Sequence, residues 1–271
     1  MTGHQPLVRF PPPPELRPFV KHAYLLDAPY HGIRQAIPLW NSSLLAFRFG
    51  DDVVSNINGP AEPLPDMSVC GVATRRYMFE GASNRLQAFI VEFTPIGLWC
   101  LFRENNFPLT DRSLDGSALI SPARFRKLHE EVNEAASENR RAAIVFSFLT
   151  ELIPTQLQAK AELAAYTAET IERQGVRALR NLPSDTGYSS RHLRRTFREV
   201  TGTTMQHYQR GKRFIRVFRA YMNQPWLDFS DVIRDDLYWD QSHFIKDFKS
   251  YTGFAPTKLP REMFAFHYIL S

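Results

Sequence analysis

Four arginines recur at helical spacing in the last third of the sequence. They are Arg191, Arg194, Arg195 and Arg198, and Ser189 stands just ahead of them. A planar guanidinium can bond a guanine edge through two hydrogen bonds and can also bind a phosphate. If the segment is a helix, these arginines project from the same side and fit the major groove of duplex DNA. The chemistry that they predict is DNA binding rather than catalysis.

The other side of the same segment is apolar. Leu193, Phe197 and Val200 recur at i, i+4 and i+7, which is the spacing of one helix face. Gly187 can adopt the left-handed conformation that ends a preceding helix, and Ser189 is a good N-cap. The sequence therefore predicts a helix, a tight turn and a second helix from residue 190 to residue 200, which is a helix-turn-helix unit.

A similar arrangement returns roughly fifty residues later. Asp240 is the expected N-cap, and Phe244, Phe248 and Tyr251 form the inward stripe. The predicted outward positions are Gln241, Ser242, Ile245, Lys246 and Lys249. Residues 204–223 are expected to form one long connecting helix. Two units in one chain predict a monomer that fills two successive major-groove turns, about 34 Å apart.

Charge is distributed unevenly along the chain. The whole sequence carries +5, whereas the segment from Arg173 to Arg219 contains twelve basic residues against only Asp185 and Glu199. Such asymmetry indicates a polyanionic partner. A solvated basic face is the alternative, but the density of arginine favours contacts with phosphates and bases. Arg216 and Arg219 are candidates for phosphate contacts.

The first half of the chain has the pattern of a β-rich domain. Four consecutive prolines at 11–14 predict a stiff extended lead-in. Between Pro38 and Phe93, short apolar runs alternate with frequent turn signals. The expected strands include residues 44–49, 69–72 and 86–93. These features predict a small barrel or sandwich with a core that includes Trp40, Trp99, Phe47, Phe89 and Phe93, one or two of which could instead line a ligand cavity.

Helical periodicity begins after this β-rich region. A short helix is expected over 95–102, and two helices are expected between Pro122 and Ile153, with their turn near 135–140. The fold class predicted is α+β: a β-rich domain with C-terminal helices at residues 1–155, followed by an all-α domain at residues 156–271.

The two predicted units resemble those of the AraC/XylS family of bacterial transcription regulators. Residues 187–202 resemble the family's first helix-turn-helix, and residues 240–244 with Phe248 and Pro256 are similar to its second-unit signature. Arg213 stands where the family has an arginine in the connecting helix. The resemblance covers roughly residues 157–261. It implies a seven-helix DNA-binding domain whose two recognition helices enter adjacent major grooves.

The resemblance also implies which side chains read bases. In the first recognition helix they are Arg191, Arg194 and Arg195, and in the second they are Gln241, Ser242, Ile245 and Lys246. Arg198 and Lys249 complete the predicted DNA-binding set. His243, inside the second helix, could bond either a phosphate or a group of its own domain.

Three positions depart from the family pattern. Pro183 replaces a small residue and is expected to kink or shorten its helix. Leu237 replaces the usual turn glycine of the second unit, which costs strain if that position needs a positive φ. Lys258 and Leu259 replace a tyrosine–arginine pair. Nearby, Asp235, Asp236 and Asp240 would repel phosphates unless they are turned aside. The departures in the second unit predict that it docks less tightly or reads less sequence.

The N-terminal half resembles the compact β-rich domain, related to cupin barrels, of one AraC subgroup. This resemblance implies ligand sensing or dimerisation. The predicted partners are double-stranded DNA, a small-molecule effector, RNA polymerase and a second copy of the chain, with the helices of residues 122–153 as the dimer surface.

Several function classes lack their sequence signals. There is no nucleophile elbow, phosphate loop, dinucleotide fingerprint or zinc pattern, so no catalytic residue, cofactor or metal is predicted. Cys70 and Cys100 are expected to be unpaired, inert thiols. No signal peptide or run of about eighteen apolar residues is present, which predicts a cytoplasmic protein without membrane contact. The alternatives are an architectural, weakly specific DNA binder and an enzyme built on the β-rich domain.

Overall fold

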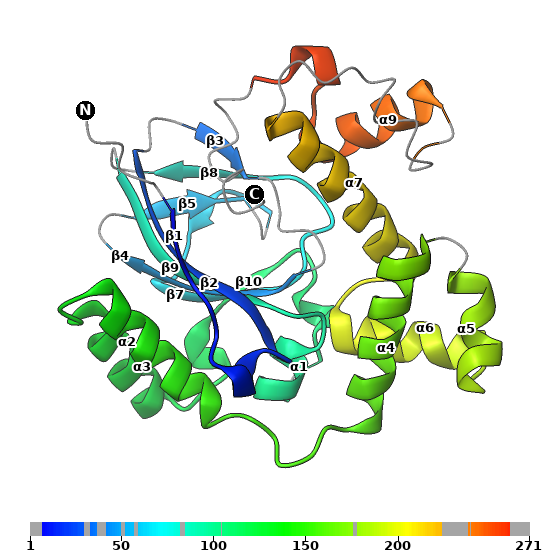
Figure 1. Cartoon of the computed structure of the whole chain (residues 1–271). Helices are drawn as coiled ribbons and strands as arrows, with labels where there is room; N and C mark the ends of the chain where they lie inside the picture. The colour runs from blue at the N-terminus through cyan, green and yellow to red at the C-terminus, as the bar shows by residue number, and fades with distance from the viewer. Residues whose placement is uncertain are drawn as a thin grey trace.

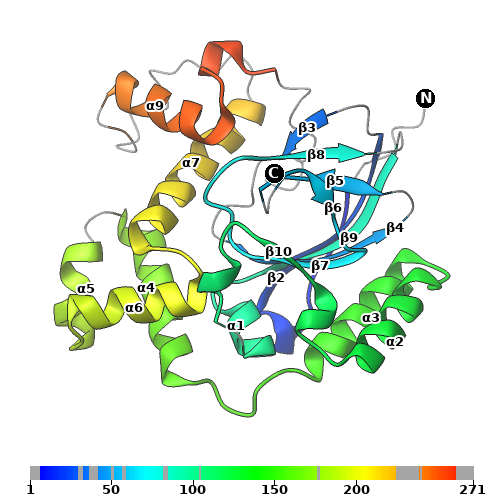
Figure 2. The same cartoon turned by 180° about the vertical axis from the view of Figure 1, so that it is seen from behind.

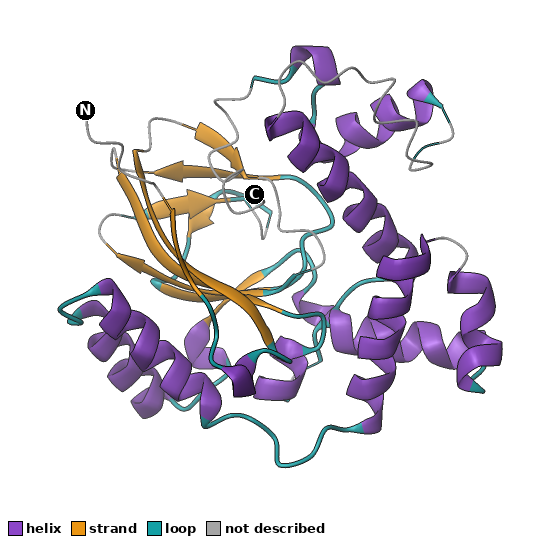
Figure 3. Cartoon of the chain, viewed as in Figure 1, coloured by secondary structure: helices purple, strands orange, loops and turns teal. Residues whose placement is uncertain are grey.

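Two antiparallel sheets form the N-terminal half of the chain (Figures 1 and 3). The computed structural model describes residues 7–29, 33–36, 42–49, 52–56, 59–81, 85–103, 105–175, 178–223, 238 and 240–260. The six-stranded sheet has the order β1-β2-β9-β4-β7-β10, and the four-stranded sheet has the order β3-β8-β5-β6. The strands are β1 Leu7–Phe10, β2 Val20–Pro29, β3 Ile33–Ala36, β4 Leu44–Phe49, β5 Val53–Ser55, β6 Glu62–Pro63, β7 Met67–Cys70, β8 Tyr77–Gly81, β9 Arg85–Phe93 and β10 Ser113–Asp115.

The long strands β2 and β9 pair at the centre of the larger sheet. Four consecutive residues of β2, Ala23–Leu26, are buried, so both faces of this strand are covered. On β9, Phe89, Val91 and Phe93 alternate into the same core. The strands predicted at 44–49, 69–72 and 86–93 correspond to β4, β7 and β9, and the predicted α+β class is confirmed.

Two N-terminal predictions need correction. The proline run is not extended throughout, because η1 at Pro14–Leu16 is a 3-10 helix. Proline suits this position, since the first helical residue needs no N–H donor. The other error is the omission of β1, β2 and β3, which all precede Pro38; the longest of them is β2. Its unbroken apolar run lacks the alternation by which a half-buried strand is recognised.

Three helices complete the N-terminal half. They are α1 Gly97–Phe102, α2 Pro122–Asn133 and α3 Glu138–Thr150. The last two form an antiparallel pair beside the larger sheet (Figure 2). The turn between them ends at Ser137, earlier than predicted, because the Ser137 side chain already caps α3 by accepting from the Arg140 backbone N–H. The predicted core residues Phe47, Phe89, Phe93 and Trp99 are buried, and Trp40 lies outside the described residues.

In the residues that the structure describes, the C-terminal half consists of helices joined by turns and loops. The helices are α4 Ala159–Gln174, α5 Ala178–Thr186, α6 Ser190–Thr201, α7 Met205–Asn223 and α9 Gln241–Thr252, followed by the 3-10 turn η5 Pro256–Lys258. The long helix α7 runs from the α4–α6 group to α9 (Figure 1). With 19 residues it is about 28 Å long. The seven helices implied by the family resemblance fall partly on residues outside this description.

The two helix-turn-helix units are packed differently. Val200 of α6, with Ala161 and Ala164 of α4, belongs to the same buried cluster as the β-rich core. The second unit has its own cluster around Phe218, Phe244 and other aromatic residues. The rest of the first unit forms a separate cluster around Leu193, Phe197 and Tyr208. The first unit therefore meets the N-terminal core at one edge, whereas the second unit is attached mainly through α7.

Candidate DNA interface

The first unit folds as its sequence predicts. The Ser189 hydroxyl accepts a hydrogen bond from the His192 backbone N–H at 3.2 Å, which caps α6. Gly187 has φ +71°, so it supplies the left-handed residue that ends α5. Phe197 and Val200 are at most 1% exposed. The apolar stripe therefore fixes which side of α6 faces outward.

All four predicted arginines of α6 are exposed on that outward side. Arg194, Arg195 and Arg198 line one surface cleft together with Phe107 from the N-terminal half. The Arg198 guanidinium stacks on the Phe107 ring, 3.4 Å from its centroid. Arg198 thus has a protein partner that no sequence signal indicates, since Phe107 lies ninety-one residues earlier.

The second unit presents its predicted residues in the same way. The Asp240 carboxylate accepts from the His243 backbone N–H at 2.7 Å and caps α9. Phe244, Phe248 and Tyr251 are buried. The exposed residues of α9 include Gln241, Ser242, Ile245, Lys246 and Lys249. Leu237, Asp235 and Asp236, whose effects were predicted, lie outside the described residues.

A buried carboxylate that sequence reasoning missed ties α9 to α7. Asp247 is 3% exposed, and its two oxygens accept hydrogen bonds from Arg210 Nε and Arg213 Nη2, each at 2.6 Å. Arg213 also stacks on Tyr238, with 4.4 Å between guanidinium and ring centroid. The signal was present, since Asp247 follows the inward Phe244 by three residues and so lies on the buried side of the helix.

Part of the positive charge of residues 173–219 is therefore not available to DNA. Arg210 and Arg213 are paired with Asp247, and the Lys212 ammonium is paired with Glu172. Arg216 and Arg219 are exposed, and their phosphate contacts stay a prediction. The exposed arginines of α6 remain as the densest outward group.

The histidines of the two recognition helices contact their own units. The His192 ring stacks on Tyr188 at 4.7 Å between centroids. The His243 ring lies edge-on to Tyr238, with its Nε2 3.4 Å from Arg213 Nη2. Of the two alternatives for His243, this geometry favours the contact within the protein.

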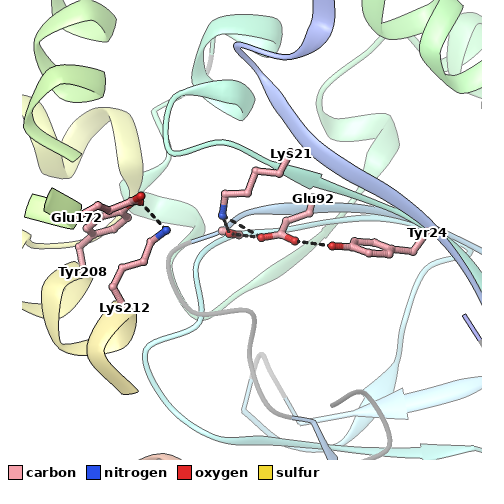
Figure 4. Close-up of polar contacts among 7 residues, drawn as sticks. Lys21, Tyr24, Glu92, Glu172, Tyr208 and Lys212 are labelled. Atoms are coloured by element: carbon pink, nitrogen blue, oxygen red, sulfur yellow. Dashed lines mark hydrogen bonds and ion pairs between the residues drawn. The ribbon is translucent and has the colours of Figure 1, made fainter. Parts of the chain in front are cut away.

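A polar cluster in the β-rich core faces α7 (Figure 4). The Lys21 ammonium donates to Glu92 Oε1 at 2.9 Å, and the Ser42 and Tyr24 hydroxyls donate to the same carboxylate. Burial opposes ionisation of Glu92, but Lys21 and these hydrogen bonds outweigh it and lower the pKa of the carboxyl.

A second polar group lies opposite this cluster on the helical side (Figure 4). The Lys212 ammonium and the Tyr208 hydroxyl both donate to Glu172. Burial, followed by the positive charge of Lys21, lowers the pKa of Lys212 even though Glu172 acts the other way. The two ammonium groups therefore repel each other across the boundary between the two halves.

The lowered pKa of Glu92 makes stability depend on acidity. The unfolded chain takes up a proton at this carboxyl near pH 4.5, before the folded chain does. The Glu92 contribution should thus be complete above that pH and be lost as the pH falls through the lower folded pKa. We expect Glu92→Gln to flatten the fall of the unfolding free energy below pH 4.5, measured by urea unfolding; an unchanged slope relative to wild type would contradict this role.

Other kinds of site are not seen in the described ranges. No group of three or more His, Cys, Asp or Glu side chains there could hold a metal ion. Cys70 and Cys100 are free, and burial raises the pKa of both thiols, to about 12 for Cys100. None of the helices searched combines the length and apolarity needed to cross a lipid bilayer.

A comparison with known protein families supports the assignment of the helical part of the chain to DNA binding. Residues 183–262, which contain both recognition helices, match the model described as a helix-turn-helix domain. The chain is a DNA-binding regulator of the helix-turn-helix type. The regulator's residues 8–115 match a second model, described as a domain of unknown function (DUF6597). No curated protein matches its sequence.

Solved structures share the regulator's fold at low sequence identity. An apo form of a ToxT point variant from Vibrio cholerae strain SCE256 matches with a TM-score of 0.50 and 11% identity, covering 92% of this chain and 98% of that one. The unsaturated fatty acid-bound wild-type ToxT of the same strain has a TM-score of 0.48 and 10% identity, covering 87% and 93%. At such identity the likeness concerns the fold alone.

One of the departures from the AraC/XylS pattern that the sequence predicts can be located in the structure. Pro183 lies inside α5, which is nine residues long. The helix continues beyond it, and the Pro183 carbonyl accepts from the Gly187 N–H at 3.0 Å. The turn between α5 and α6 is therefore formed despite the proline, with Gly187 supplying the positive φ.

Proposed function

We propose that the regulator reads DNA by placing α6 and α9 in consecutive major grooves. The main supporting observation is that both helices are N-capped, held by buried apolar stripes and joined by one 19-residue helix, with their predicted contact residues exposed. In this proposal Arg191, Arg194 and Arg195 read bases from α6. Gln241, Ser242, Ile245 and Lys246 do so from α9, while Arg198 and Lys249 contact the DNA beside them.

Removing one base-reading arginine tests this proposal. We expect Arg194→Ala and Arg195→Ala each to weaken binding to the selected operator by about 1–3 kcal/mol and to relax base preference at one position. Fluorescence anisotropy at fixed salt gives both affinities, on the operator and on a random duplex. Arg126→Ala, an exposed arginine of α2, is the matched control. Equal losses on operator and random duplex would contradict base reading.

The competing proposal is an architectural DNA binder with little base preference. Asp247, which anchors α9 to α7, supports the reading function instead, because a fixed helix can hold its side chains against particular base edges. Selection of bound fragments from a random pool separates the two. An enriched motif supports sequence reading, and its absence supports the architectural role.

We further propose that the N-terminal half binds an anionic effector near Lys21 and Lys212. The supporting observation is that the Lys21 and Lys212 side chains extend from opposite sides of the boundary between the two halves (Figure 4), so one carboxylate between them could pair with both ammonium groups. Calorimetry with a panel of carboxylates, including an unsaturated fatty acid, provides the test. A true effector should bind at least about tenfold more weakly to Lys212→Ala, and Lys127→Ala, an exposed lysine of α2, is the control. If Lys212→Ala and Lys127→Ala bind the carboxylate with equal affinity, the proposed site is wrong.

The remaining roles follow from this assignment. We propose that residues 1–155 sense the effector and dimerise through α2 and α3, while residues 156–271 bind DNA in the cytoplasm and contact RNA polymerase. No catalytic role is included. Light scattering at increasing concentration tests the dimer, which a constant monomer mass would contradict.

A further inference from the structure

Two segments of the N-terminal half reach the C-terminal ends of both recognition helices. Residues 105–111 contact the end of α6, and Arg76 of residues 74–76 lies against the end of α9. We call these two segments together the bracket. Each recognition helix ends in a left-handed glycine, Gly202 at φ +78° and Gly253 at φ +84°. The bracket lies against both glycines.

At α6 the bracket supplies hydrogen bonds that the helix cannot make itself. The last carbonyls of an α-helix have no partner within the helix. The Asn106 backbone N–H donates to the Glu199 carbonyl at 3.1 Å, and its Nδ2 donates to the Val200 carbonyl at 2.5 Å. The Thr110 hydroxyl donates to the Gly202 carbonyl. Because Asn106 is 1% exposed, these bonds are shielded from water.

The approach at this end of α6 is close. A Cβ on Gly202 would lie 3.0 Å from the Asn106 carbonyl oxygen, so only glycine fits without a shift. The neighbouring Phe107 ring carries the Arg198 guanidinium. The bracket therefore contacts α6 both at its end and along its outward side.

At α9 the contact is made by one side chain. The Arg76 guanidinium occupies the space in which a side chain on Gly253 would lie. The C-terminus of a helix carries a partial negative charge, which a guanidinium stabilises. Arg76 also lines a surface cleft with Thr74 of the bracket and with Ser250 and Tyr251 of α9.

Asp111 joins the two segments of the bracket. Its carboxylate accepts from the Thr74 backbone N–H at 2.6 Å and from the Thr74 hydroxyl at 2.5 Å. Its own N–H donates to the Val72 carbonyl at 3.0 Å. Asp111 has φ +58°, a conformation that few residues other than glycine, asparagine and aspartate adopt readily. The contacts to α6 and to α9 thus belong to one connected piece of chain.

We infer that the bracket sets the separation of α6 and α9, and that Asp111 and Arg76 are positioning residues for the spacing between two DNA half-sites. Helix α7 contacts α6 through Tyr208 and α9 through Arg210 and Arg213, but it fixes their separation only as long as it does not bend. The bracket adds a second attachment to each recognition helix. This inference rests on the proposed reading of consecutive grooves.

The test uses the full-length protein and a set of operators whose half-sites are separated by the selected spacing and by one or two base pairs more or fewer. We expect wild type to prefer one spacing. Asp111→Gly removes the carboxylate but tolerates the positive φ, and Arg76→Ala removes the contact at α9. The spacing preference is the affinity for the preferred spacing divided by the affinity for an altered spacing. In both variants this ratio should fall by about fivefold or more. Arg112→Ala, an exposed arginine beside Asp111, should keep the wild-type ratio.

The possible results distinguish failure of the bracket's role from failure of the proposed two-groove reading. If both variants keep the wild-type spacing preference, the bracket does not position the helices and the inference is wrong. Equal weakening on every spacing and on isolated half-sites also overturns it, because that pattern indicates damage to a unit rather than a lost separation. If wild type itself uses a single half-site, the proposed function fails before the bracket is considered.

Discussion

Asp247→Ala should lower the free energy of unfolding of the second unit by about 3 kcal/mol, since it leaves two arginines without their shared carboxylate. This value is at the lower end for a broken buried pair, because the Arg210 side chain is 41% exposed and its charge stays partly solvated. DNA binding through α9 should fall with it, as α9 loses its polar attachment to α7.

Urea unfolding, followed by circular dichroism, measures this effect. Asp185→Ala removes an exposed aspartate from α5 and serves as the control. Asp247→Asn keeps one acceptor oxygen, so its free energy of unfolding should lie between those of Asp247→Ala and Asp185→Ala. If Asp247→Ala is as stable as Asp185→Ala, the carboxylate does not hold α9 in place.

Phe197→Ala should destabilise the first unit by about 3–5 kcal/mol, the usual cost of a large cavity. Phe197 is 1% exposed, and its ring meets Tyr208 of α7 edge-on, with 5.5 Å between centroids. It packs α6 against the helix that connects the two units.

The loss can be measured from the same unfolding curves, with Phe197→Leu as the conservative comparison. Leucine fills more of the space and should cost less. If the free energy of unfolding of Phe197→Ala lies within about 1 kcal/mol of the wild-type value, this contact does not hold α6. The buried stripe would then no longer explain why one side of α6 faces outward.

The recognition helices could be predicted because their signals are local. The caps Ser189 and Asp240 stand next to the helices that they start, and each apolar stripe lies within twelve residues. Once the stripe is known, the exposed positions follow from the helical period. All nine predicted contact residues are accordingly exposed, although their contact with DNA stays a prediction.

The parts that were missed depend on contacts distant in sequence. Nothing near Phe107 indicates that Arg198 will stack on it, and nothing near Thr74 indicates that Asp111 will bind it. Likewise β2 was missed because it is central and buried on both faces, so it lacks the alternation of a half-exposed strand. Charge counting was misleading for a related reason, since it could not separate Arg210 and Arg213, which pair with Asp247, from the outward arginines of α6.

Guanine-methylation interference on the selected operator tests most directly whether α6 and α9 occupy consecutive major grooves. The account predicts two clusters of sensitive guanines or flanking contacts, separated by one helical turn of about 10 base pairs. Arg195→Ala should remove sensitivity at one guanine of the first cluster, while Lys246→Ala should change the second cluster only. A single cluster, or one cluster altered by both variants, would contradict the two-groove account.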